Sequence, residues 1–507
     1  MSVYKRPGIY ISEVLLPAPI TNSITAQAAG MVAAPFAQGP TTLTLVNSWY
    51  EFTKHFGGYN SLFPATFAVS LFFQNGGREL YVKRIMGQTA QAATGVVPRA
   101  SGAGTVLTLT AKNKGTDGNN YRVQISNGTA VGNSLNIAIY KEGVPGTSTS
   151  IQDDILVEQY DNVYTDEPLS NSYAPTVINS VSQLFTCTVS DNTNLPSVNV
   201  VPFTGGTNGN AIIDTDYSSS TDGVIASIAT IDRPLVVFLP GLYDLLSANA
   251  ATQIQLDVAA ACESSQKNFY VGETQKDRTV TQALTTADSL GGGRSFAAVY
   301  YPHVFVSDPL GVATGATRKV GPAGAVAGLF LRTDATVGPF KAPAGLTANL
   351  VGVVSTEKAF TTTELDSLNS SKYPVNPIRQ IPGAGISVMG ARTLLQDGTA
   401  NKYVNMRRSL IYIRKSLQNL TEFALFENNN EQLWGRINTT LNTFLNEYRN
   451  QGGLRGSSPS DAYFIKCDSE NNTAASIASG EVRIEVGVAL QYPAEFVVIN
   501  LSQKTLN

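Results

Sequence analysis

The stretch NEQLWGRINTTLNTFLNEYRNQGG, residues 430–453, decides how the C-terminal part of this chain folds. Its large apolar residues recur at steps of three and four, which is the period of one helix face. They are Leu433, Trp434, Ile437, Leu441, Phe444, Leu445 and Tyr448. Polar residues occupy the other positions, and Gly452 and Gly453 end the pattern. The spacing predicts an amphipathic helix over residues 430–450.

The period changes to two in the stretch EVRIEVGVAL, residues 481–490. One face would carry Val482, Ile484, Val486, Val488 and Leu490, and charged residues alternate with the first of them. This pattern predicts a half-buried strand over residues 481–490. Beyond a proline, a second apolar run, FVVI at residues 496–499, is short enough for one strand and needs a sheet edge to join.

The first residues pose the same problem as the last ones. The stretch VYKRPGIYISEV, residues 3–14, has the composition of an extended arm, and Pro17 and Pro19 stiffen the spacer that follows it. Unpaired strands of this kind either fold back on their own subunit or pair with the sheet edges of neighbouring subunits. The residues alone leave both alternatives open.

Short motifs are distributed over most of the chain. In the first two thirds they are RPGIY (6–10), SWYEF (48–52), FGG (56–58), FFQNGG (72–77), YVKR (81–84), VGPAG (320–324) and KAPAG (341–345). The last third has VNPIR (375–379), GARTL (390–394), FENNNE (426–431), AYFIKCD (462–468) and PAEFV (493–497). In this order and spacing the chain resembles the contractile tail sheath proteins of bacteriophages and related injection machines.

The expected fold class is a multidomain α/β and α+β protein. Strand and helix patterns alternate over residues 21–97 and again over 206–373, whereas 98–205 is rich in Thr, Val, Asn and Gly with frequent turn signals. We therefore expect an α/β central domain (21–97 and 206–373), which the resemblance implies to be subtilisin-like, and an inserted β-sandwich (98–205). An N-terminal arm (1–20) precedes them, and a C-terminal α+β sheath assembly domain with its own arm (374–507) follows Tyr373 and Pro374.

Several elements of the central domain are specific enough to predict. Ser48 would cap a short helix that ends at Gly57, Pro64 would start a second helix, and residues 79–85 would form a strand. Further along, the pattern predicts a buried strand at 235–239, a helix at 248–262, a strand at 268–271 and a close-packed helix at 321–330.

Charge is low and nearly balanced. The 507 residues include 35 Lys and Arg against 38 Asp and Glu, for a formal charge of −3, and only 14% are charged. Such a surface suits dense packing of copies and argues against nucleic acid as the main partner. One basic cluster stands out: Lys402, Arg407, Arg408, Arg414 and Lys415. Without interleaved aromatic residues, it fits a solvated helix face or an acidic neighbouring subunit better than DNA.

No apolar run reaches the roughly 18 residues that a membrane span needs, and the first residues lack the apolar core of a signal peptide. We therefore expect no membrane insertion, with assembly in the host cytoplasm. Cys187, Cys262 and Cys467 are widely separated, which excludes a metal site of the usual spacing and favours reduced, buried thiols. Disulfides between subunits are the alternative.

An enzyme on the central domain is a second hypothesis. A Ser-His-Asp relay would have to use His55 or His303, and the loosest candidate joins His303 to Asp308 and Ser295. Neither histidine stands near a nucleophile-elbow motif, and GGGR at residues 291–294 lacks the spacing of a dinucleotide loop. We expect no catalytic residue, cofactor or metal. A non-contractile adhesive virion protein is the third hypothesis.

The resemblance implies a mechanical function. Each subunit would lend its arms to neighbours, polymerise helically around a tail tube, and contract to drive the tube through a host envelope. Partners would be further copies of the chain, the tail tube protein, and the baseplate and tail terminator proteins, and the product would be a virion tail. The expected strand-exchange residues are Tyr4, Ile9, Tyr10, Ile11, Val14, Val482, Ile484, Val486, Val488, Phe496, Val497, Val498 and Ile499. The candidate tube-facing residues are Glu431, Asn438, Asn442, Asn446, Glu447 and Arg449.

Overall fold

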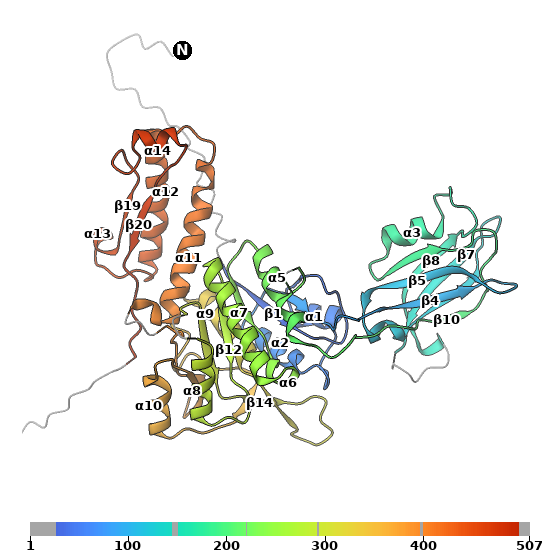
Figure 1. Ribbon diagram of the computed structural model, residues 1–507, viewed down its shortest axis with the longest axis horizontal. Coiled ribbons are helices and arrows are strands. Elements are labelled where there is room, and N and C mark those ends of the chain that lie inside the picture. The colour runs from blue at the N-terminus through green and yellow to red at the C-terminus, as the bar shows by residue number, and fades with distance from the viewer. Residues whose placement is uncertain (1–26, 144–150, 220, 292–293, 396–398, 496–507) are drawn as a thin grey trace, which may run out of the picture. The chain divides into compact units, whose positions relative to one another are not determined.

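A computed structural model describes residues 27–495, apart from 144–150, 220, 292–293 and 396–398 (Figure 1). The chain divides into two compact units. Among the described residues, the smaller unit holds Gln27 and 413–490, and the larger unit holds 28–412 together with 491–495. The predicted arm at residues 1–20 and the apolar run at 496–499 lie outside the described residues.

An eight-stranded sheet forms the centre of the larger unit, in the order β18-β17-β13-β12-β11-β1-β3-β2. The pairs from β17 to β3 are parallel, and antiparallel β18 and β2 lie at the two edges. The strands are β1 (Ala29–Ala34), β2 (Thr44–Val46), β3 (Leu80–Arg84), β11 (Leu235–Phe238), β12 (Phe269–Glu273), β13 (Ala297–Tyr301), β17 (Asn376–Ile381) and β18 (Gly385–Val388). The order of the strands changes direction between β1 and β11.

Burial explains why these segments are strands. Every residue of β1, β11, β12 and β13 is buried, as expected for the middle of a parallel sheet that is covered on both faces. The continuous apolar runs predicted as strands at 235–239 and 268–271 are confirmed as β11 and β12. The prediction of a strand at 79–85 is confirmed as β3.

Helices cover this sheet and connect its strands. They are α1 (Trp49–Phe56), α2 (Ala65–Gln74), α4 (Asp214–Ser218), α5 (Val224–Thr230), α6 (Leu242–Leu245), α7 (Ala248–Ser265), α8 (Val280–Ser289), α9 (Ala323–Thr336) and α10 (Thr362–Ser370). The predicted start of α1 is confirmed, because the Ser48 side chain accepts a hydrogen bond from the Glu51 amide at 3.1 Å. The helix ends at Gly57, and Pro64 directly precedes α2, as predicted.

The Gly- and Ala-rich composition of α9 has a clear reason. A Cβ atom at Gly324 would lie 2.2 Å from the Ala68 carbonyl oxygen, and one at Gly328 would lie 2.3 Å from the Phe72 carbonyl oxygen. Both oxygens belong to α2, so the two helices pack backbone against backbone. This confirms the prediction of a close-packed helix. A smaller antiparallel sheet follows in the same unit, in the order β15 (Thr317–Val320), β14 (Val304–Ser307), β16 (Val353–Thr356).

The region between β3 and α4 forms two antiparallel sheets. One has the order β4 (Ala92–Pro98), β5 (Thr105–Lys114), β9 (Phe185–Val189). The other has the order β10 (Val200–Pro202), β6 (Tyr121–Asn127), β7 (Leu135–Lys141), β8 (Ile155–Val163). Side chains from both sheets and from α3 (Ala174–Val181) form one buried cluster. Mixed α/β architecture is thus confirmed, while the terms β-sandwich and subtilisin-like stay predictions.

Arg84, the last residue of β3, joins this inserted region to the large sheet. Its guanidinium is buried and donates hydrogen bonds to four backbone carbonyl oxygens. Three belong to residues 36–39, which follow β1, and the fourth belongs to Lys114 at the end of β5. Burial lowers the pKa of Arg84 to about 10, so the side chain is charged at neutral pH.

The smaller unit consists of helices and one small sheet. Its elements are η4 (Glu422–Ala424), α12 (Glu431–Asn450), α13 (Pro459–Ala462), β19 (Tyr463–Lys466), α14 (Ala474–Ala478) and β20 (Glu485–Val488). The helix predicted at 430–450 is confirmed, because the Asn430 side chain caps α12 by accepting the Leu433 amide at 3.1 Å. Helix α11 (Val404–Thr421) contains the boundary between the units, at 412/413.

The predicted domain bounds stay predictions, and one observation bears on the start of the predicted assembly domain. Strands β17 and β18 lie within the predicted assembly domain, 374–507, and pair with the large sheet.

The three cysteine thiols are buried and free, and burial raises the pKa of all three, that of Cys187 to about 12. In the described part of the chain, no helix has the length and apolarity needed to cross a bilayer.

Candidate assembly surface

The two-stranded sheet of the smaller unit packs on one face of α12. The buried cluster there contains Leu433, Trp434, Ile437 and Leu441 from the helix, with Cys467 from the segment after β19. Ile465 of β19 and Val486 of β20 pack against this cluster. The apolar side chains of α12 and the inward-facing side chains of the small sheet therefore form one small core, which holds the sheet on the helix.

The predicted strand at 481–490 is too long. The ladder with β19 covers only Glu485–Val488. The buried side chain of Asn472 forms hydrogen bonds with the backbone just before this ladder. Asn472 Oδ1 accepts the Arg483 amide at 2.7 Å, and its Nδ2 donates to the Arg483 carbonyl at 3.0 Å. Val482 and Ile484 still pack on the core cluster, but they lie outside the strand. Sequence periodicity cannot show that a side-chain amide replaces a strand partner.

The hydrogen-bond phase of the sheet decides which backbone groups of β20 point outward. The pair Tyr463 and Val488 is flanked by the bond from the Ala489 amide to the Ala462 carbonyl, 2.8 Å long. Bonded and non-bonded pairs alternate in an antiparallel ladder, so Val486 and Val488 belong to non-bonded pairs. Their amide and carbonyl groups therefore point away from β19. Within residues 413–490, no strand pairs with this outer side of β20.

The face of the sheet opposite α12 is partly aromatic. Phe464 on β19 is 53% exposed, and its ring lies over Gly487 on β20. A Cβ atom at Gly487 would lie 2.1 Å from this ring, so the glycine makes room for the aromatic side chain. The outer edge of β20 is thus short, partly exposed, and next to an exposed aromatic ring. An additional strand can extend such an edge through backbone hydrogen bonds.

The strand-exchange residues predicted from the sequence divide into three groups. Val486 and Val488 lie in β20 with outward backbone groups, and Val482 and Ile484 precede it. The remaining ones lie outside the described residues: Tyr4, Ile9, Tyr10, Ile11, Val14, Phe496, Val497, Val498 and Ile499. The structure therefore describes the residues that were predicted as the acceptor side, and strand exchange itself stays a prediction.

Several of the candidate tube-facing residues of α12 make hydrogen bonds within the smaller unit. Asn438 donates to the Cys467 carbonyl at 2.8 Å, and Asn442 accepts the Tyr463 hydroxyl, so both serve the sheet. Arg449 donates to Asn446 at 3.2 Å and to the Ser457 carbonyl at 3.2 Å. Glu431 and Glu447 are exposed. Asn442 is exposed as well, and a tube contact through α12 stays a prediction.

Two members of the predicted basic cluster, Arg407 and Arg408, make contacts inside the larger unit. Arg408 is buried, pairs with Asp334 and stacks on the Phe330 ring at 4.6 Å. Arg407 stacks on the Phe296 ring at 4.3 Å. These two guanidinium groups contribute to packing rather than to a continuous basic surface.

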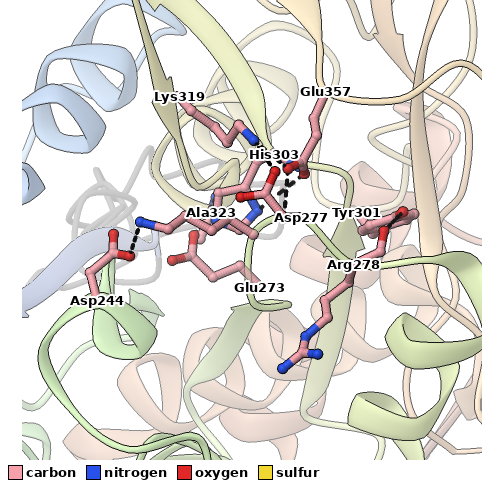
Figure 2. Close-up of polar contacts among 10 residues, drawn as sticks. Asp244, Glu273, Asp277, Arg278, Tyr301, His303, Lys319, Ala323 and Glu357 are labelled. Carbon is pink, nitrogen blue, oxygen red and sulfur yellow. Dashed lines mark hydrogen bonds and ion pairs between the residues drawn. The ribbon is translucent and has the colours of Figure 1, made fainter.

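A polar cluster at the carboxyl ends of the large sheet is the other place where chemistry could occur (Figure 2). His303 is buried, and its Nδ1 lies 3.9 Å from Glu357 Oε2. Burial lowers the pKa of His303 to about 4, so the ring is neutral at pH 7. Lys319 pairs with both Asp277 and Glu357, and Asp308 pairs with Arg318 at 3.0 Å. The predicted candidate acid, Asp308, is therefore bound to an arginine and not to His303.

Glu273 is the most deeply buried acid of this cluster. It lies at the end of β12 and accepts hydrogen bonds from the amides of Gly241, at 3.0 Å, and Ala323, at 3.4 Å. Burial raises the pKa of Glu273 to about 7. A Cβ atom at Gly321 would lie 2.0 Å from Glu273 Oε2, so the glycine before α9 leaves space for the carboxylate. Sequence reasoning missed Glu273, and its only signal is a lone acid at the end of an apolar strand.

Comparisons with known proteins agree with the resemblance seen in the sequence. Residues 396–504 match the family model of the phage tail sheath C-terminal domain. The tail sheath protein of Vibrio phage KVP40 is 25% identical over 184 residues, which are 36% of this chain and 26% of that protein. The tail sheath protein of Enterobacteria phage T4 is 22% identical over 296 residues, which are 56% of this chain and 43% of that protein.

Solved structures extend the likeness to the whole fold. A chain of the anti-feeding prophage baseplate is 19% identical, with a TM-score of 0.60. The superposition covers 99% of this chain and 100% of the baseplate chain. The contracted sheath complex of the extracellular contractile injection system PVC has a TM-score of 0.58 at 20% identity, with 99% of both chains covered. A sheath tail protein of Listeria innocua has a TM-score of 0.62 at 12% identity, with 91% and 95% covered. The resemblance to contractile tail sheath proteins is confirmed.

Proposed function

We propose that this relative of the contractile tail sheath proteins is a structural subunit of a contractile tail sheath, in a phage or a related injection system. The match of residues 396–504 to the sheath C-terminal domain is the observation that carries the proposal. The chain spans 26% and 43% of the length of the two curated relatives, so the activity of a whole sheath protein is part of the proposal and not a finding. No enzymatic activity is included.

Subunits join by strand exchange in this proposal. The outer side of β20, with the outward backbone groups of Val486 and Val488, is the acceptor edge. The donors are the N-terminal arm, about residues 3–14, and the C-terminal strand, about 495–501. Backbone hydrogen bonds between strands depend little on side-chain identity, so the contacts tolerate rotation of one subunit against the next. A mesh built in this way can change its pitch without coming apart.

Contraction is then a transition between two lattices of the same subunits. The extended lattice is metastable, and the compact one buries more surface between subunits. Energy is stored during assembly. The proposed partners are further copies of this chain, the tail tube, the baseplate and the tail terminator, with assembly in the host cytoplasm and a virion tail as the product. The subtilisin-like central domain and the inserted β-sandwich would form the outer layer.

Electron microscopy of negatively stained protein tests assembly directly. The full-length chain and a version lacking residues 1–16 are compared at the same high concentration. Hollow tubes from the full-length chain and monomers from the truncated one support strand exchange through the arm. Compact monomers in both samples contradict it.

A point substitution tests the acceptor edge. Val486→Pro removes one outward amide and leaves the ladder with β19 intact, because proline is tolerated where the amide of an edge strand faces away from its partner. Val486→Ala is the matched control, since it loses the same side-chain packing and keeps the amide. We expect tubes from Val486→Ala and only monomers from Val486→Pro. Tubes of equal yield from both variants would exclude this edge as the acceptor.

A further inference from the structure

The five residues after the smaller unit, 491–495, are bound to the larger unit although they form no helix or strand. Asn405 is buried, and its Nδ2 donates to the Gln491 carbonyl at 3.2 Å and to the Phe340 carbonyl at 2.9 Å. The rings of Tyr403 and Tyr492 meet edge to face, with 6.3 Å between centroids. This irregular segment is therefore held by contacts of its own.

The strongest of these contacts joins Arg392 and Glu495. Arg392 Nε donates to Oε1 at 2.9 Å and Nη2 donates to Oε2 at 2.6 Å, so the carboxylate is bound by both arms of the guanidinium. The Tyr403 hydroxyl donates to Oε2 at 3.4 Å. The two side chains are only 13% and 21% exposed, and the hydrogen bonds to Glu495 raise the pKa of Arg392.

Arg392 is itself fixed on the large sheet. Its Nη1 donates to the Asn369 carbonyl at 2.8 Å, and its amide donates to Asn376 Oδ1 at 2.8 Å. Asn376 is buried in β17, and its Nδ2 donates to the carbonyls of Val299, at 3.1 Å, and Arg392, at 2.8 Å. A continuous set of hydrogen bonds thus runs from Glu495 to β13.

Ion pairs on a protein surface usually contribute little, because both side chains lose conformational freedom and solvent screens their charges. This pair differs in three respects. It is bidentate, it is largely shielded from solvent, and its arginine makes further hydrogen bonds to Asn369 and Asn376. Such an arrangement fixes the position of a backbone more than it adds to the stability of the fold.

We propose that Arg392 and Glu495 form a clamp that fixes residue 495 on the larger unit, at the point where the proposed donor strand begins. The inference rests on the proposed function, because it makes the clamp the positioning device for the donor strand at about 495–501. A donor strand that starts from a fixed point loses less conformational entropy on binding than one that starts from a flexible segment. It should therefore bind its acceptor edge at a lower subunit concentration.

The test compares full-length variants by the subunit concentration above which tubes form, measured by sedimentation. Glu495→Gln removes the charge and one oxygen acceptor at nearly constant size, and Arg392→Lys keeps the charge and loses the fork. Arg294→Gln is the control, since it breaks an ion pair with Glu263 elsewhere in the larger unit. We expect Glu495→Gln to raise the critical concentration about tenfold, Arg392→Lys to lie between it and wild type, and Arg294→Gln to match wild type.

Two further measurements separate positioning from a general loss of stability. The melting temperature of the Glu495→Gln monomer should equal that of the Arg294→Gln monomer, and added salt should raise the critical concentration of wild type more than that of Glu495→Gln. A critical concentration for Glu495→Gln equal to that of wild type overturns the clamp and leaves the proposed function standing. Failure of wild type itself to form tubes at any concentration contradicts the proposed function instead.

Discussion

The Glu273 carboxylate accepts the Gly241 amide at 3.0 Å, which ties the end of β12 to the residue before α6. The Ala323 amide at the start of α9 donates to the other oxygen of the same carboxylate, at 3.4 Å. One buried acid thus connects a central strand of the large sheet with the starts of two helices.

The first prediction concerns the pH dependence that Glu273 confers. Burial raises its pKa from 4.5 to about 7 in the folded protein. Because the folded value is the higher one, the free energy of unfolding falls as pH rises from about 4.5 to about 7, by about 3 kcal/mol in all. Glu273→Gln cannot ionise and should lack this component. We expect the variant to gain stability relative to wild type between pH 5 and pH 8.

Urea unfolding followed by circular dichroism at the two pH values measures this difference. Glu447→Gln, at an exposed position of α12, is the control and should follow wild type at both. An equal offset between Glu273→Gln and wild type at pH 5 and pH 8 would show that Glu273 titrates alike in the folded and unfolded chain.

The second prediction concerns the space that Gly321 leaves for Glu273. A methyl group there would lie 2.0 Å from the carboxylate, so Gly321→Ala should displace it and destabilise the protein by about 2–4 kcal/mol. Gly58→Ala is the control, because nothing lies within 4 Å of a Cβ atom at that position. In thermal unfolding, adding Gly321→Ala to Glu273→Ala should cost much less than adding it to wild type. Fully additive effects of the two substitutions would contradict the steric explanation.

The third prediction concerns the attachment of the inserted region by Arg84. Arg84→Met fills similar space but leaves four backbone carbonyl oxygens, two of them in fully buried contacts, without this donor, which should cost about 3 kcal/mol or more. Limited proteolysis should then cut the two connections of the inserted region, near residues 85–91 and 205–213, faster than in wild type. Arg78→Met removes an exposed arginine and should change neither the cleavage rate nor the melting temperature.

The fourth prediction concerns the start of β20. Asn472→Ala removes the side chain that binds both backbone groups of Arg483, and should destabilise the smaller unit by about 2 kcal/mol. Hydrogen exchange at the amides of 482–484 should accelerate, while amides in the middle of α12 should exchange as before. Asn428→Ala, at an exposed position between α11 and α12, is the control. Unchanged exchange at 482–484 would mean that the ladder alone orders this segment.

Much of the fold could be predicted from the sequence, because burial leaves a periodic trace. The runs at 235–239 and 430–450 show the continuous apolar pattern of a central strand and the three-to-four spacing of a packed helix, and both predictions are confirmed. Ser48 and Gly57 mark the ends of α1 through their chemistry alone.

The candidate site was less predictable, because its deciding contacts join residues far apart in the chain. The strand at 481–490 was predicted too long, since periodicity cannot register that Asn472 takes the place of a strand partner. Asn438 and Asn442 look solvent-facing by spacing, yet they bind β19 and the residue after it. Arg392 and Glu495 are 103 residues apart, and only tertiary structure shows that they meet.

The hydrogen-bonded path from Glu495 to β13 also determines how the molecule bears tension. A pull on the chain beyond residue 495 is transmitted through the fork of Arg392 and the Asn376 side chain to the Val299 carbonyl, and so enters the middle of the large parallel sheet. The four-residue ladder between β19 and β20 lies outside this load path. Under the proposed function, traction along the C-terminal segment would therefore reach β13 through side-chain hydrogen bonds that bypass this ladder.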